Sequence, residues 1–377
     1  MDTNMGETEK LKIVSLNVRG LRAQNKRLKL FKWLKSNHYA DIVYLQETHS
    51  TQLDEKLWTE QWGGEIFFCH GDSNARGVCV MINIRKSSLV HNVQLDDIGR
   101  SIMIDLTVSE RRLTLVNIYA PNHDDPVFIT NLIHLIENQI NEDHVDKKGG
   151  ALLHTNRNMK NLLKTYMEES DLIDIWRKHH PKDRHYTYHC KIRNEYIFSR
   201  LDFFLVSFGI SNLVESSSIG PSILTDHSLI KLTLQIDADR RGPGFWKCNC
   251  SLLHDIDYVN KVKTTIREIV DIENEQNPGL LWEVVKLGIR TETIRYCIQK
   301  KRSKNNLMSA LERRLKTVQN RFEQTPTDED KQDIELIKLD ISDILQEQIN
   351  GCIMRTKINW QEYGEKTSKF FLSLEKK

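Results

Sequence analysis

The sequence predicts an α/β protein: a two-layer α/β sandwich flanked by helices and followed by an α-helical segment. Two observations predict this class. Over residues 11–236, strand-like runs alternate with helix-like runs, and this mixed order is typical of packed layers of sheet and helix. After residue 245 the strand pattern stops, and apolar residues recur at helical spacing.

The first strand is predicted at residues 11–16, and a helix follows at 26–36, where apolar residues recur every three or four positions. Residues 42–45 form a short apolar run, as expected of a strand buried on both faces. Turn-bounded, β-rich runs and two further amphipathic stretches complete the region. These predict strands at 77–84, 101–108, 112–119, 200–206 and 229–236, and helices at 126–139 and 156–170.

The chain divides, in this prediction, into a disordered N-terminus (residues 1–10), the α/β domain (11–236), a linker (237–244) and a helical segment (245–377). The linker is charged and contains glycine and proline. Two helical stripes follow it, over 307–322 and 334–348, separated by Thr325-Pro326-Thr327-Asp328, which suits a helix start. We expect two antiparallel helices, as a coiled-coil hairpin or as part of a small bundle.

Composition excludes some classes of protein. Seven cysteines without framework spacing favour free thiols in a reducing compartment, and Cys248 and Cys250 lack the further ligands of a zinc site. The N-terminus has no apolar signal segment, and no run is long enough to span a membrane. We therefore expect an intracellular protein, of the nucleus or cytoplasm, with no membrane partner. A net charge of +2 is too small to indicate nucleic-acid binding by itself.

Five short motifs occur in a recognisable order. They are Leu11–Leu21 (LKIVSLNVRGL), Asp41–Thr48 (DIVYLQET), Leu115–Asn122 (LVNIYAPN), Ser199–Ser207 (SRLDFFLVS) and Thr225–Ser228 (TDHS). Together they resemble the exonuclease–endonuclease–phosphatase superfamily, and within it the apurinic-endonuclease-like nuclease of LINE-type non-LTR retrotransposons. The resemblance implies the sandwich fold predicted above, a Mg²⁺ cofactor (or Mn²⁺ in its place) and DNA as the partner.

Glu47, directly after the apolar run 42–45, is the predicted metal ligand, because Mg²⁺ takes carboxylate oxygens and water. Without Gln46 and Thr48 beside it, a solvated strand-end glutamate would be the simpler interpretation. Asp226 matches a family position that supports the metal.

His227 is the predicted catalytic histidine, in direct contact with phosphate, although a lone histidine is more often an ordinary surface or core residue. Asp202 interrupts an apolar run, where burying a carboxylate is costly unless it accepts a hydrogen bond. In the family the matching aspartate orients the histidine, as the acid of a catalytic triad does.

Asn17, Tyr119 and Asn122 match phosphate-positioning residues of the family, although Tyr119 also suits a core tyrosine at a strand end. Arg19 stands where many members carry a second metal-supporting acid.

Two basic clusters are candidates for DNA contact or are simply solvated faces. The first contains Arg19, Arg22, Lys26 and Arg27, and the second surrounds Tyr186-Thr187-Tyr188, itself interpretable as a plain strand.

One family motif is missing. The family carries Gly-Asp-Phe-Asn between the Tyr119 and Asp202 motifs, where its Asp activates water, and residues 141–156 contain no such sequence. We interpret this as an internal deletion near Val145. Asp143 or Asp146 would have to substitute, although no predicted strand directs either at the site. Loss of a general base typically costs a factor of roughly a hundred to ten thousand in rate.

The predicted function is a Mg²⁺-dependent DNA endonuclease of retrotransposon origin, impaired by that loss. The alternatives are an inactive nucleic-acid-binding remnant and, more remotely, a phosphatase of phosphorylated lipids or inositols, whose chemistry shares the fold. Residues 358–371 resemble the segment that precedes a reverse transcriptase, and no polymerase carboxylate motif follows. The interpretation is therefore a chain truncated before that domain, without polymerase activity.

Overall fold

The computed structural model describes residues 8–38, 40–83, 88–109, 111–140, 158–192, 195–237, 250–272 and 277–363. Several predicted features fall outside these ranges. They are most of the N-terminal segment, the deletion near Val145 with Asp143 and Asp146, nearly all of the linker at 237–244, and the end of the reverse-transcriptase-like stretch. The chain forms two compact units, one of residues 1–240 and 314–342, the other of residues 241–313 and 343–377.

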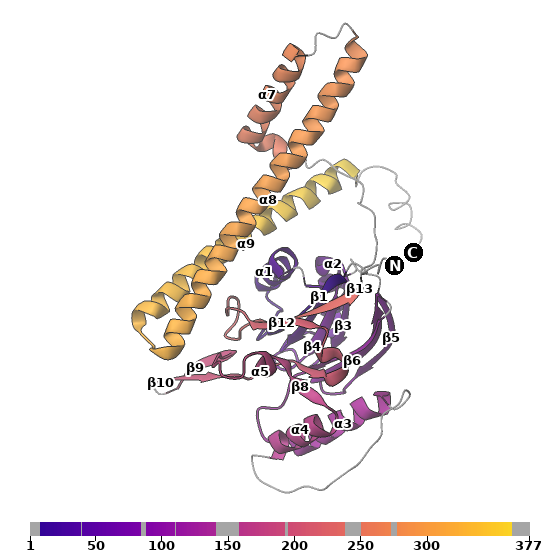
Figure 1. The fold of residues 1–377 in the computed structure, drawn as a ribbon, viewed down its shortest axis with the longest axis vertical. Coiled ribbons are helices and arrows are strands. Elements are labelled where there is room, and N and C mark those ends of the chain that lie inside the picture. The colour runs from indigo at the N-terminus through magenta and orange to yellow at the C-terminus, as the bar shows by residue number, and fades with distance from the viewer. Residues whose placement is uncertain are drawn as a thin grey trace, which may run out of the picture. The chain divides into compact units, whose positions relative to one another are not determined.

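The first unit is built on two sheets, and the predicted fold class is confirmed (Figure 1). The larger contains, in order, β12 (Val214–Ile219), β13 (Ile230–Asp237), β1 (Thr8–Asn17), β2 (Ile42–Gln46), β4 (Val78–Ile82) and β3 (Glu65–Cys69). The smaller contains β5 (Ser88–Leu95), β6 (Ser101–Val108) and β7 (Arg111–Ile118).

The two sheets face each other across one apolar core, to which alternate residues of each strand contribute, as the two-residue period of a strand requires. On β1 these are Leu11 and Ile13, and on β13 they are Ile230, Leu232 and Leu234. Burying such side chains is the main stabilising contribution to a fold of this kind.

Helices cover the outer faces of the sheets, with α1 and α2 on the side opposite α3 and α4 (Figure 1). Leu30 and Phe31 of α1 are buried, and Phe31 packs edge-on against Trp62 of α2. Phe128 and Leu132 of α3 pack with Val116 of β7. The helices are α1 (Gln24–Trp33), α2 (Glu55–Trp62), α3 (Pro126–Ile140), α4 (Asn158–Glu169), α5 (Ile175–His179) and α6 (Phe208–Ser211).

Two short antiparallel pairs lie beside the main sheets: β8 (Leu172–Asp174) with β11 (Leu205–Ser207), and β9 (Tyr188–Ile192) with β10 (Glu195–Ser199). The strand predicted at 200–206 is largely wrong, because residues 201–204 have no regular structure. Thr225–Ser228 lies in the loop that enters β13.

Strand register determines where the motifs meet. β1 runs parallel to β2, with Asn17 opposite Gln46, and antiparallel to β13, with Ser15 opposite Ile230. The ends of β1 and β2 and the start of β13 therefore lie at one edge of the sheet. Beneath this edge, Asn117 of β7 accepts from Gln46 Nε2 at 2.6 Å and donates to the carbonyls of Leu45 and Cys79, which ties the two sheets together.

The two helices expected near the C-terminus are longer than predicted: α8 spans Pro278–Gln324 and α9 spans Asp328–Tyr363. Residues 314–342, the last turns of α8 and the first turns of α9, belong to the first unit, and we call them the hairpin tip. Arg321 and Asp330 form an ion pair within the tip. A coiled-coil arrangement of the two helices stays a prediction.

The second unit contains a small cluster of its own. Leu252, Tyr258 of α7 (Ile256–Ile272) and Tyr296 of α8 are buried together, and the Tyr296 hydroxyl donates to Asp255 at 2.8 Å. No helix among the described residues is long and apolar enough to cross a membrane.

Gly77 permits the close approach of two loops at the site edge. Its φ is +84°, and a Cβ there would lie 2.5 Å from Thr48 Oγ1 and 3.3 Å from His49 N. Thr48 is fully buried and cannot move aside. We expect Gly77→Ala to lower the free energy of unfolding by about 2 kcal/mol, measured by thermal or urea unfolding.

Gly209→Ala is the control, because nothing lies within 4 Å of a Cβ at that position. Equal unfolding midpoints for Gly77→Ala and Gly209→Ala would show that the close approach of the two loops does not depend on glycine at position 77.

Candidate active site

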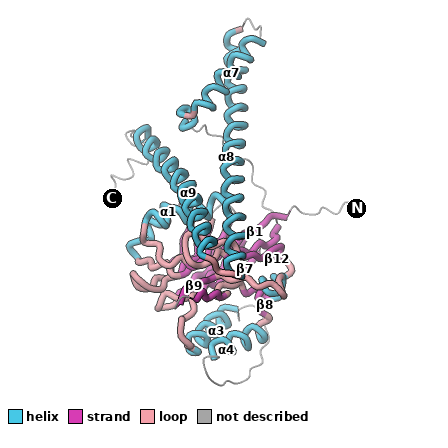
Figure 2. Tube along the Cα trace, turned by 90° about the vertical axis from the view of Figure 1, so that its left-hand side faces the viewer, coloured by secondary structure: helices cyan, strands magenta, loops and turns pink. Residues whose placement is uncertain are grey.

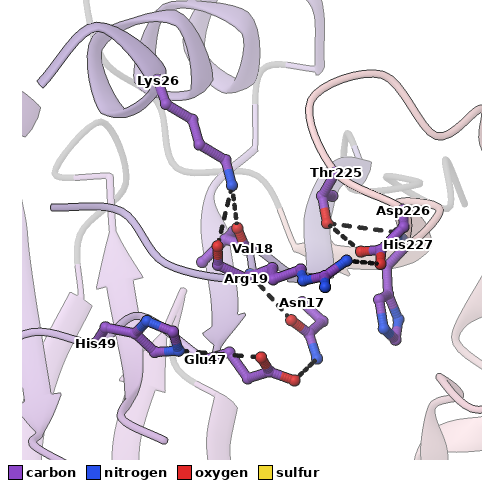
Figure 3. Close-up of polar contacts among 9 residues, drawn as sticks. All are labelled: Asn17, Val18, Arg19, Lys26, Glu47, His49, Thr225, Asp226 and His227. Atoms are coloured by element: carbon purple, nitrogen blue, oxygen red, sulfur yellow. Dashed lines mark hydrogen bonds and ion pairs between the residues drawn. The ribbon is translucent and has the colours of Figure 1, made fainter. Parts of the chain in front are cut away.

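Asn17 and Glu47 lie side by side where β1 and β2 end (Figure 3). The Asn17 side-chain amide donates to Glu47 Oε1 at 2.8 Å, and its oxygen accepts from the Arg19 backbone N–H at 3.1 Å. Asn17 is only 4% exposed. The buried amide thus orients the Glu47 carboxylate, as the parallel pairing of the two strands requires.

The loops after these strands contain three non-glycine residues in the left-handed region: Arg19 (φ 44°), Glu47 (φ 52°) and His49 (φ 54°). Such conformations cost of order 1 kcal/mol or more each and persist where the surroundings enforce them. Here the enforcement is a ladder of backbone bonds, from Gly20 N–H to the Glu47 carbonyl and from His49 N–H to the Arg76 carbonyl. The site edge is held in a strained shape that presents Glu47 to solvent.

Asp226 reaches the same edge from the loop before β13 (Figure 3). Its carboxylate accepts from the Thr225 hydroxyl at 3.1 Å and pairs with the Arg19 guanidinium at 2.6 Å. Burial alone would raise the pKa of Asp226, but the Thr225 hydrogen bond and the Arg19 charge outweigh it and hold that pKa below its ordinary value. The Arg19 guanidinium therefore neutralises the charge of Asp226.

Lys26, at the start of α1, is a site residue whose role the sequence did not reveal. Its ammonium donates to the carbonyls of Val18, at 2.5 Å, and Arg19, at 3.2 Å (Figure 3). Burial lowers the pKa of Lys26, while the nearby charges of Asp226 and Glu47 act in the opposite direction. Position in a basic cluster was the only sequence signal for it.

His227 and Asp202 form the predicted pair. His227 Nδ1 lies 2.8 Å from Asp202 Oδ2, and both side chains are largely buried. Burial opposes protonation, but the hydrogen bond and charge of Asp202, with the charges of Asp226 and Glu47, raise the pKa of His227 above its ordinary value. The Tyr188 ring packs on the imidazole at 4.8 Å between centroids. An imidazolium is therefore favoured beside the carboxylates.

Thr187 holds this pair in place and was not predicted as a site residue. Its buried hydroxyl accepts from the backbone N–H groups of Leu201 and Asp202 at 2.9 and 3.0 Å. Its carbonyl accepts from Ser228 N–H at 2.7 Å. One residue thus fixes both the segment of Asp202 and the loop of His227, and an ordinary threonine between two tyrosines carries no sequence signal for this role.

Tyr119 and Asn122 lie at the same edge, after β7. Burial raises the pKa of Tyr119, as do the charge of Glu47 and a hydrogen bond with it, while a hydrogen bond with Asn122 acts in the opposite direction. Tyr119 also packs against the apolar core, as a core tyrosine at a strand end does, and its role in positioning phosphate stays a prediction. The structure brings Asn17, Glu47, Tyr119 and Asn122 together.

One residue of the first basic cluster differs from expectation. Arg22 lies 3.9 Å from Asp54 and is half-exposed, but Arg27 is buried, donates to the Leu21 and Arg22 carbonyls, and is structural. In the second cluster, Tyr186 packs on Phe198 of β10, and Tyr196 and Phe198 pack on Phe322 of the hairpin tip. These rings are partly buried, and DNA contact by this cluster stays a prediction.

The oxygen donors at this edge suit a hard cation. Glu47 and Asp226 supply two carboxylates, and Mg²⁺ is commonly held by one or two carboxylates with waters and substrate phosphate. Within the described residues, no three His, Cys, Asp or Glu side chains form a group that could hold a metal ion by themselves. A Mg²⁺ ion at this edge would have Glu47, whose carboxylate Asn17 orients, as its candidate ligand.

Comparison with known proteins supports the resemblance. Residues 14–153 match the model of the Endonuclease/Exonuclease/phosphatase family. A curated relative, the Transposon TX1 uncharacterized 149 kDa protein of Xenopus laevis, is 25% identical over 386 residues, which cover 97% of this chain and 29% of the relative. The resemblance predicted from the motifs is confirmed.

Solved structures are similar at low identity. An AP endonuclease from Archaeoglobus fulgidus has 18% identity and a TM-score of 0.47, over 59% of this chain and 99% of that chain. The endonuclease domain of TRAS1, a telomere-specific non-LTR retrotransposon, has 12% identity and a TM-score of 0.42, over 60% of this chain and 100% of that chain.

The match to the Endonuclease/Exonuclease/phosphatase family includes Asn17, Glu47 and Tyr119, whereas Asp202, Asp226 and His227 lie beyond residue 153. For the latter three residues, geometry is the argument for a place in the site.

The pKa of His227 should depend on Asp202. Because it is raised above 6.5, it contributes stability that is present below that pH and is lost as the pH rises through the folded value. Asp202→Asn removes the main raising charge, so we expect a lower pKa of His227 and a smaller gain of stability toward acid. Proton NMR titration of the ring in chelator, assigned with His227→Gln, measures it.

Asp97→Asn, at an exposed position, is the matched control and should leave the titration of His227 unchanged. An equal pKa in Asp202→Asn and the parent would refute Asp202 as the cause.

Proposed function

We propose that this chain is a Mg²⁺-dependent DNA endonuclease of transposon origin, acting in the nucleus or cytoplasm with reduced activity. The observation that carries this proposal is the His227–Asp202 pair at 2.8 Å, at the sheet edge where Asn17 orients Glu47. An oriented histidine, an oriented carboxylate and nearby cations are what phosphodiester cleavage requires. The family match and the transposon relative support this chemistry.

In the proposed mechanism, the positive side chains receive the scissile phosphate. The imidazolium of His227 faces it as proton donor or cationic clamp, with Asp202 holding the ring. Arg19 is 70% exposed, so its guanidinium can exchange Asp226 for a phosphate oxygen in a charge-assisted pair. Tyr119 and Asn122 contact the phosphate from the loop after β7. A Mg²⁺ ion held by Glu47, with Asp226, would neutralise charge that develops on the phosphate oxygens.

Impairment is part of the proposal. The family's water-activating aspartate has no counterpart in the sequence between Tyr119 and Asp202, and no described carboxylate joins Glu47 and Asp226 as a third. Water would attack without that base, at a cost of roughly a hundredfold or more. Until Arg19 turns to the phosphate, the Arg19–Asp226 pair also competes with the metal for a carboxylate oxygen of Asp226.

An inactive DNA-binding remnant is the second candidate. The missing water-activating aspartate and the Arg19–Asp226 pair both favour it. Plasmid nicking distinguishes the two candidates. Both would bind supercoiled plasmid and shift it in a gel-shift assay, but a remnant would never nick it.

Nicking of supercoiled plasmid by the full chain should require Mg²⁺ or Mn²⁺, because Glu47 and Asp226 offer only hard oxygen donors. Excess chelator should abolish it, and restoring Mg²⁺ should recover it. Conversion to open circles on agarose measures the rate. Nicking that continues at full rate in chelator would remove the metal assignment.

His227→Ala should reduce nicking at least about a hundredfold, the lower range for a catalytic acid or base, with an unchanged circular dichroism spectrum. The nicking rate of Asp202→Asn should fall by a similar factor, because the His227 ring loses its hydrogen-bond partner. His134→Ala, at an exposed position on α3, is the control and should cut like the parent. If His227→Ala also cuts like the parent, His227 is structural.

A further inference from the structure

The hairpin tip is bound to the part of the first unit that carries the site. Gln319 of α8 makes three hydrogen bonds to Ser222: it accepts from the Ser222 backbone N–H at 3.3 Å and donates to the carbonyl at 3.2 Å and to Oγ at 2.7 Å. Gln319 is 8% exposed and Ser222 1% exposed. Such bonds, shielded from water, are costly to break, because each group would be left unsatisfied.

Ser222 belongs to the loop that carries Asp226 and His227, four residues before Asp226. The two ends of this loop are joined by the Gly220 N–H, which donates to the Leu229 carbonyl, and the Ser228 N–H donates to the Thr187 carbonyl. The Gln319 bonds add a side-chain contact at Ser222. The loop that carries Asp226 and His227 is therefore held by α8 as well as by Thr187.

Two further contacts bind the tip to elements of the site. Phe322, 5% exposed, packs edge-on against Tyr196 and Phe198 of β10, with ring centroids 4.7 and 6.0 Å away. Lys29 of α1, one turn after Lys26, donates to Ser342 Oγ of α9 at 2.6 Å. Figure 1 shows the α8–α9 turn beside β9 and β10, and in Figure 2 the lower ends of α8 and α9 lie near β9. Burial lowers the pKa of Lys338 of α9, and the negative charge of Asp226 acts in the opposite direction.

We propose that the hairpin tip is a built-in brace for the active site, in which Gln319 is a positioning residue that fixes, through Ser222, the loop of Asp226 and His227. The proposal rests on the proposed nuclease function, since positioning has a catalytic effect only if the site cuts DNA. A misplacement of about 1 Å can cost roughly a hundredfold in rate.

The experiment compares Gln319→Ala with Gln324→Ala in the full chain. Gln324 is the same residue type on the same helix but is exposed, which makes it the matched control. Hydrogen–deuterium exchange of peptides covering residues 220–229 reports the loop directly, without DNA or metal. Plasmid nicking in Mg²⁺ reports catalysis, with kcat and KM measured separately.

We expect Gln319→Ala to speed exchange in residues 220–229 about tenfold, and to lower kcat between roughly tenfold and a hundredfold with KM within about twofold. Gln324→Ala should match the parent in exchange rate, kcat and KM. Exchange equal to the control would overturn the brace. Faster exchange with an unchanged kcat would overturn the positioning role.

Two other outcomes also decide the matter. If the parent chain does not nick DNA, the nuclease function fails, and exchange alone then decides whether the brace exists. If Gln319→Ala speeds exchange throughout the first unit, it has disturbed the fold, and Gln319→Glu replaces it. That variant keeps an acceptor for Ser222 N–H but loses the Nε2 group that donates to the Ser222 carbonyl and to Oγ, so an exchange rate and kcat between parent and alanine support the brace. Parent-like values for both refute it.

Discussion

The pairing of β1 with both β2 and β13 is the constraint on which the site depends. Because β1 is parallel to β2, their carboxyl ends lie together, and because it is antiparallel to β13, the start of β13 joins them. Asn17 and Glu47 lie about two hundred residues before the Asp226–His227 loop, yet three adjacent strands place them at one edge. A register shift of one residue in the pairing of β1 would turn Asn17, its last residue, to the opposite face of the sheet.

The sequence predicted much of this edge because its signals are local. Apolar runs such as 42–45 identified buried strands, and motif order identified Glu47, Asp202 and His227. The roles that the sequence did not reveal, those of Thr187 and Arg27, depend on tertiary contacts. Thr187 is an ordinary threonine until its hydroxyl meets two N–H groups from residues 201 and 202. Arg27 looked like its basic neighbours, but its guanidinium is buried among the Leu21 and Arg22 carbonyls.

The error at residues 200–206 has a physical reason. The apolar residues there suggested a strand interrupted by Asp202, whereas the structure uses an irregular segment whose N–H groups bond to Thr187 instead of to a neighbouring strand. The Thr187 hydroxyl replaces the hydrogen bonds of a strand ladder, and the Asp202 carboxylate is thereby directed to His227. Local propensity cannot reveal such a replacement, since the acceptor lies some fourteen residues earlier in the sequence.

The contact between Ser222 and Gln319 joins residues 97 positions apart, and this separation has a consequence for how the protein is made. Loop closure costs only about 0.6 kcal/mol for each doubling of loop length, so the distance is a small thermodynamic penalty, but it sets an order of events. During synthesis, all strands of the two sheets emerge from the ribosome before α8 does. The sandwich can therefore form first, and the first unit is completed only when residues 314–342 have been translated.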